Sequence, residues 1–139
     1  MSKSLSVKFP SWLALFFALA TAGCAPRRAG IFKQTPIQVT SESLYRDYKF
    51  EADANGKYLG RLLEVSGAVD QTGESTTGEP FVILHGGDAL GDVWCHFTSE
   101  SREQARRIKT GQTITLRGIC LGKGINVMLH ECSLREGKG

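Results

Sequence analysis

Residues 93–120 read VWCHFTSESREQARRIKTGQTITLRGIC, and this stretch decides the fold of the chain. In residues 93–97 apolar side chains alternate with tryptophan and histidine, which is the period of a half-buried strand. Residues 101–109 begin with the S-x-x-Q spacing of a capping box and are followed by a Thr-Gly pair, so they predict a helix. Apolar residues alternate again in 113–120. The stretch therefore predicts a strand, a helix and a second strand.

Further strand patterns flank this stretch on both sides. Upstream, residues 61–70 alternate apolar and polar side chains, with Gly67 as a bend or bulge, and 81–84 form an apolar run after the polar loop 71–80. Downstream, a Gly-Lys-Gly turn leads into residues 125–134. The runs 81–84 and 125–134 each form a hairpin with the nearer strand of the quoted stretch. Three strands, a helix and two strands follow the order of the OB-fold, a small Greek-key barrel.

One amphipathic helix is expected before the first strand. Thr40 or Ser41 can cap it, and Asn55-Gly56 supplies a left-handed stop about four turns later. Its apolar residues at helical spacing are Leu44, Tyr45, Tyr48 and Ala52. The predicted fold class is all-β with accessory helices: a five-stranded OB-fold Greek-key barrel, an N-terminal helix and a helix between strands three and four.

The same residues resemble the tRNA-anticodon-binding-like OB-fold family of bacterial proteins, many of them lipoproteins. The resemblance covers Ile37–Leu134 and is carried by Tyr48, Ala52 and Ala54 and by residues 58–61, 64–69, 93–97, 111–118 and 127–132. It implies the OB-fold. The family has no established common activity, so the resemblance implies no particular function.

The N-terminal segment resembles the secretion signal of a bacterial lipoprotein. Lys3 and Lys8 form a basic head, an apolar run begins at Trp12, and the segment ends in Thr21-Ala22-Gly23-Cys24. These four residues have the form of a lipobox, although leucine is more usual at the first position. The apolar run is too short for a transmembrane helix, which needs about 20 residues. An ordinary secretory signal with an incidental cysteine is the alternative.

These features divide the chain into a lipoprotein signal peptide (1–23), a lipidated flexible tether (24–39), an OB-fold domain (40–135) and a short tail (136–139). The resemblance implies that Cys24 carries diacylglycerol and fatty acyl chains such as palmitate, which would hold the protein to a membrane. Inner-membrane retention signals usually carry aspartate directly after this cysteine, whereas this chain has alanine. We therefore expect attachment to the outer membrane, facing the periplasm.

The charge of the chain lies mainly outside the predicted domain. The whole chain has 17 Lys and Arg against 14 Asp and Glu, whereas Pro36 to Arg135 holds 11 basic and 13 acidic residues, a net charge of −2. Proteins that bind nucleic acid release counterions through clustered lysine and arginine. We therefore do not expect nucleic acid as a partner.

The sequence contains no pattern typical of a catalytic site. A G-x-S-x-G elbow, a phosphate-binding loop and paired catalytic carboxylates are all missing, so we expect a non-enzymatic protein without a cofactor. His85, His96 and His130 lie on three strand-like segments but lack the spacing of zinc ligands. We expect no metal site.

A binding function is the remaining prediction. OB barrels that bind oligonucleotides expose aromatic residues on the second and third strands within a positive groove. The candidate ligand-binding residues are Arg61, Trp94, His96, Arg117 and Lys123. Because the domain is nearly neutral, and because OB barrels also bind peptides, sugars and small ligands, we expect an envelope protein or a small ligand. Binding of single-stranded nucleic acid is the alternative.

Three cysteines remain for the domain once Cys24 is lipidated. In an oxidising compartment at most one disulfide can form among them, either Cys120–Cys132 or Cys95–Cys132. Buried free thiols are the third alternative, because cysteine packs as a small apolar residue.

Overall fold

The computed structural model describes residues 34–89 and 91–136. The expected signal peptide and lipidation site at Cys24 lie outside these residues. The elements in chain order are β1 (Ile37–Thr40), α1 (Ser41–Phe50), α2 (Ala54–Tyr58), β2 (Leu62–Glu74), β3 (Pro80–Asp88), β4 (Gly91–Phe97), α3 (Arg102–Arg107), β5 (Thr113–Lys123) and β6 (Val127–Leu134).

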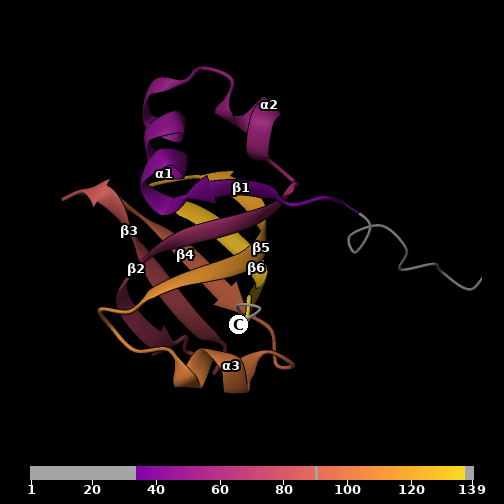
Figure 1. Ribbon diagram of the computed structural model, residues 1–139, viewed down its shortest axis with the longest axis vertical. Helices are drawn as coiled ribbons and strands as arrows, with labels where there is room; N and C mark the ends of the chain where they lie inside the picture. Colours follow the sequence, from indigo (N-terminus) through magenta and orange to yellow (C-terminus); the bar gives the residue numbers. More distant parts are fainter. Residues whose placement is uncertain (1–33, 90, 137–139) are drawn as a thin grey trace, which may run out of the picture.

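Strands β2 to β6 form a closed barrel. The sheet order is β1-β2-β3-β4-β6-β5, and an additional pairing of β2 with β5 closes it. The neighbours in the barrel are antiparallel except β4 and β6, which run parallel. Helix α3 connects β4 to β5 and lies at one end of the barrel, whereas α1 and α2 lie at the other end (Figure 1). The predicted OB-fold is confirmed.

The core lies inside this barrel because each strand turns alternate apolar side chains inward. In β4, for example, Val93, Cys95 and Phe97 are buried and the residues between them are half-buried. Leu44 and Tyr45 of α1 join the same core. Other fully buried members are Leu63, Val65, Val82, Leu84, Leu116, Cys120, Val127 and Leu129.

Strand β1 corrects the expected tether. Ile37–Thr40 pairs in parallel with residues 63–66 of β2, so the folded part of the chain includes residues that we assigned to a flexible spacer. Ile37 and Val39 are partly buried and pack against the core. The alternation in this strand is only four residues long, and its partner is more than twenty residues away in the sequence, so local pattern does not reveal it.

The N-terminal helix is also different from the prediction. Thr40 is the N-cap, and its hydroxyl accepts a hydrogen bond from Ser43 N at 3.1 Å, as predicted. The helix ends at Phe50, however, and a second short helix, α2, follows, with Asn55-Gly56 inside it. The left-handed residue after α2 is Gly60, with φ of 71°.

Side-chain contacts between the two helices explain this break. The hydroxyl of Tyr58 donates to the carboxylate of Asp47 at 2.6 Å, and the rings of Tyr48 and Tyr58 lie 5.9 Å apart. Tyr58 is buried. One straight helix would carry Tyr58 away from these partners, so tertiary contacts outweigh the local helical period.

Two smaller predictions also need correction. Ser101 does not cap α3 with its side chain: its oxygen accepts from Thr98 N at 3.1 Å, and its hydroxyl donates to the carbonyl of Cys132 at 2.7 Å, which attaches the helix to β6. The irregularity in β2 lies between Val69 and Gln71 rather than at Gly67. Gly67 instead makes room for Ser41, since a Cβ there would stand 2.2 Å from the Ser41 hydroxyl.

The cysteines Cys95, Cys120 and Cys132 are all buried and all free. Neither expected disulfide is formed, and the alternative of buried free thiols describes the structure. Cys120 contacts the hydroxyl of Tyr48 at 3.3 Å. Burial, with a contribution from neighbouring Cys95, raises the pKa of the Cys132 thiol well above its ordinary range.

This burial leads to a prediction about thiol chemistry. The full chain carrying Cys24→Ser should show no reaction with a thiol-specific disulfide reagent while folded, because only exposed thiolates react. After denaturation three thiols should react. The measurement is the absorbance of the released thiol. A single reactive thiol in the denatured chain would mean that two of the cysteines are paired.

Candidate functional site

Three aromatic side chains gather on the outer face of the β3–β4 hairpin. Because Val93, Cys95 and Phe97 point into the core, Trp94 and His96 lie on the opposite face of β4. The register places His96 opposite Phe81 of β3, which is also half-buried. We call Phe81, Trp94 and His96 the aromatic surface.

The rings of the aromatic surface contact one another. Phe81 and Trp94 are stacked, with centroids 5.5 Å apart and planes inclined by 14°. The His96 ring lies 6.3 Å from Phe81 and 6.4 Å from Trp94, tilted against both. Mutual packing fixes these rings on a rigid hairpin, which reduces the entropy that they would lose on contact with a ligand. Such a surface suits planar or apolar groups.

The sequence identified Trp94 and His96 but missed Phe81. Phe81 belongs to the run 81–84, which is apolar throughout, so the sequence does not distinguish the outward residue from the inward ones. The strand register supplies that information. Met128 of β6 lies beside Trp94 on the other side and is half-buried as well.

The three predicted basic residues have other surroundings. Arg117 Nε donates to the carboxylate of Glu64 at 3.0 Å, and the Lys123 ammonium lies 5.6 Å from the centre of the Tyr45 ring. Arg61 is exposed and directly precedes β2. Among these five predicted residues, all in the described part of the chain, only Trp94 and His96 are in ring contact with each other. The structure therefore brings Trp94 and His96 together and gives Arg117 and Lys123 contacts with Glu64 and Tyr45 instead.

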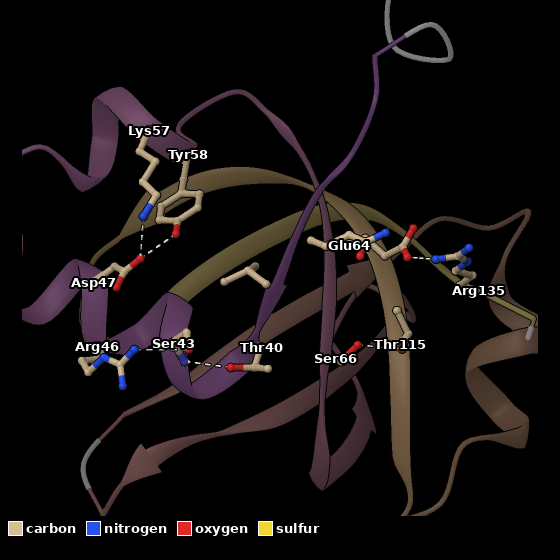
Figure 2. A pocket seen from close by; sticks show the side chains of 12 residues that line it. Thr40, Ser43, Arg46, Asp47, Lys57, Tyr58, Glu64, Ser66, Thr115 and Arg135 are labelled. Atoms are coloured by element: carbon tan, nitrogen blue, oxygen red, sulfur yellow. Dashed lines mark hydrogen bonds and ion pairs between the residues drawn. The ribbon is translucent and has the colours of Figure 1, made fainter.

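A concave region, which the sequence did not indicate, lies on a different part of the fold from the aromatic surface. We call it the trough; its volume is about 740 Å³. Helices α1 and α2 form one wall of the trough, and β1 crosses the trough. Strands β2 and β5 continue the surface of the trough to its other wall (Figure 2). The lining residues are Gln38, Val39, Thr40, Ser43, Arg46, Asp47, Lys57, Tyr58, Glu64, Ser66, Thr115 and Arg135.

Both acids in the trough are already paired. Asp47 accepts from Tyr58 at 2.6 Å and from the Lys57 ammonium at 3.0 Å. These contacts, the Tyr58 hydrogen bond first, hold the pKa of Asp47 below its ordinary value of 3.8. Glu64 is 4% exposed and forms ion pairs with Arg117 and Arg135.

Hydroxyl groups occupy the space between these ion pairs. Ser66 and Thr115 share one hydrogen bond of 2.8 Å across β2 and β5. At the helical wall, the Arg46 guanidinium donates to the Ser43 hydroxyl at 3.4 Å. Figure 2 shows the Arg46 and Ser43 side chains next to Thr40, at the start of α1.

Two further features bear on the function. Within residues 34–89 and 91–136, no three His, Cys, Asp or Glu side chains come close enough together to hold a metal ion. No helix in the same residues has the length and apolar character needed to cross a bilayer.

Comparison with known proteins places this geometry in a family. The tRNA_anti-like family model matches residues 7–133. A similar crystal structure is that of the "putative nucleic acid-binding lipoprotein" of Klebsiella pneumoniae subsp. pneumoniae MGH 78578, with a TM-score of 0.61 and 14% identity over 73% of this chain and 92% of that chain. A comparison with curated proteins found no match. The resemblance noted in the sequence is confirmed, and the chain belongs to the tRNA_anti-like family.

Proposed function

We propose that this chain is a lipid-anchored binding protein of the bacterial cell envelope, and that its OB barrel holds a protein partner on the aromatic surface without catalysing a reaction. The stacking of Phe81 on Trp94, on the outer face of the second and third barrel strands, is the observation that carries the proposal. This is the face on which OB-folds bind their ligands.

Three observations support the lipid anchor. Residues 12–24 have the pattern of a lipoprotein signal that ends at Cys24. The family match begins at residue 7 and so includes this segment. The Klebsiella relative is itself named a lipoprotein. Ala25, in place of the aspartate of retention signals, favours the outer membrane and the periplasm.

The surroundings of the aromatic surface favour a protein partner. Trp94 has buried Ile83 on one neighbouring strand and half-buried Met128 on the other, so both cross-strand neighbours of its ring are apolar. Aromatic residues and methionine are enriched at protein interfaces, and methionine adapts to the shape of a partner. Asp92 precedes Trp94 on the same face of β4 and is acidic. An apolar and acidic face suits a polypeptide better than a phosphate backbone.

Single-stranded nucleic acid is the second candidate. Stacked aromatic side chains bind bases in OB-folds, and the name of the Klebsiella relative includes nucleic acid binding. Our expectation that nucleic acid is not a partner is not borne out by this comparison.

The anchor is tested by replacing its cysteine. In a bacterial host fed labelled palmitate, the full chain should carry label and sediment with membranes, whereas Cys24→Ser should lose the label and leave the membrane fraction. Without the acyl chains, each buried CH₂ no longer contributes its roughly 0.8 kcal/mol to membrane binding. Thr21→Leu, which restores the usual lipobox residue, is the matched control and should behave like the unaltered chain. A labelled, sedimenting Cys24→Ser chain would refute the anchor.

The partner is tested by photocross-linking in intact envelopes, with a photoreactive residue at position 96. We expect a discrete protein adduct that Trp94→Ala reduces by about tenfold or more, since loss of a buried aromatic contact costs about 2 kcal/mol or more. Phe50→Ala is the control, because Phe50 lies at the C-terminal end of α1, is 73% exposed and is not in ring contact with Trp94.

The nucleic-acid alternative is tested in parallel by measuring the fluorescence anisotropy of a labelled oligothymidylate. Salt-sensitive binding that Trp94→Ala removes would replace the protein partner by nucleic acid.

A further inference from the structure

We propose that the trough is a second binding site, separate from the aromatic surface, and that it takes a phosphate group at Arg46. The trough lies on α1, α2, β1, β2 and β5, whereas the aromatic surface lies on β3 and β4. The inference therefore does not depend on the partner proposed above.

The first step is the charge that remains after internal pairing. The lining contains three cations, Arg46, Lys57 and Arg135, and two acids, Asp47 and Glu64. Glu64 is held by Arg135 and also by Arg117 from the neighbouring strand, and Asp47 is held by Lys57. Counting also the paired residues outside the lining, Arg117 and Glu51, four cations face three acids, so the region keeps one net positive charge.

The second step identifies the cation that is left for a ligand. Among the described residues Arg46 forms no ion pair with an acid; it donates a hydrogen bond to the neutral hydroxyl of Ser43 and acts on Asp47 through its charge alone. A guanidinium carries five N–H donors in a planar fork that matches the oxygens of a carboxylate or a phosphate. The pairing of both acids with other cations leaves Arg46 as the group that an anion would meet.

The third step is the set of hydroxyl donors in the trough. The Ser43 oxygen accepts from Arg46, and the Thr40 oxygen accepts from Ser43 N, so both hydroxyl hydrogens stay free to donate. Ser66 and Thr115 share one hydrogen bond, which leaves one of their two hydroxyl hydrogens for a ligand. A volume of about 740 Å³ lies within the range of small-molecule sites, roughly 300 to 1,000 Å³. There is room for an organic molecule attached to the anionic group.

The experiment uses the full chain with Cys24→Ser and follows its backbone amides by NMR during titration with inorganic phosphate. The expected result is a saturable shift of the Ser43 and Arg46 amides. Arg46→Gln should abolish saturation, that is, weaken binding at least about tenfold, because a charge-assisted hydrogen bond contributes about 1.5–3 kcal/mol. Arg107→Gln, an exposed arginine on α3 at the other end of the barrel, is the matched control and should bind like the parent chain.

A second arm identifies the source of the anion. The same three chains are sedimented with vesicles of phosphatidylcholine alone and with vesicles that also contain phosphatidylglycerol. Binding to the anionic vesicles that Arg46→Gln removes and Arg107→Gln keeps assigns the site to lipid headgroups. Saturable phosphate binding without vesicle binding assigns it to a soluble phosphorylated ligand. If neither probe binds, or if Arg46→Gln binds as well as Arg107→Gln does, the proposal is wrong.

Discussion

Replacing Arg117 and Arg135 together by glutamine is expected to lower the free energy of unfolding by about 3–5 kcal/mol, the cost of leaving a buried charge without its partners. The charge in question is Glu64, which is 4% exposed, whereas both arginine side chains are about half exposed. The arginines can return to water when the pair is broken. The carboxylate cannot, so its loss of partners dominates the effect.

This asymmetry makes the prediction specific. Each single variant, Arg117→Gln or Arg135→Gln, should cost less than half of the double variant, because the other arginine still pairs with Glu64. Adding Glu64→Gln to the double variant should recover most of the loss, since the buried charge is then gone. Urea unfolding followed by Trp94 fluorescence measures all four chains. A double variant that Glu64→Gln fails to rescue would show that packing, not charge, is responsible.

Gly86→Ala should destabilise the protein by about 3 kcal/mol, the upper part of the usual range for overpacking. A Cβ on Gly86 would stand 2.2 Å from the carbonyl oxygen of Gly91 on the paired strand and 3.1 Å from the buried ring of Tyr45. The first neighbour is backbone, so it cannot turn aside as a flexible side chain could. Strands β3 and β4 must separate to accept the methyl group.

The control for this prediction is Gly124→Ala. Gly124 lies exposed between β5 and β6, and a Cβ there would meet nothing within 4 Å. It should change the free energy of unfolding by less than about 0.5 kcal/mol, as surface substitutions usually do. Gly86 is part of β3, and the aromatic surface lies on the hairpin of β3 and β4. Gly86→Ala should therefore also change Trp94 fluorescence in the folded state. Equal stability of the two variants would contradict the described hairpin.

The candidate sites could be predicted only in part. Trp94 and His96 followed from the alternation in β4, because the inward residues identify the outward ones. Phe81 required the register between β3 and β4. Arg117 was identified as a ligand-binding residue from its charge alone, yet it pairs with the buried carboxylate of Glu64. The sequence does not show that a charge has an internal partner fifty residues away.

The sequence by itself determined the barrel and the order of its strands, because five strand-like runs and one intervening helix are local properties of the chain. It also determined the signal-like segment that ends at Cys24. Only the tertiary structure decided that Ile37–Thr40 adds a parallel strand, that α2 folds back onto α1, and that twelve residues from six segments line the trough. These features depend on contacts between distant residues, whose free energy outweighs the weak preferences of a short segment.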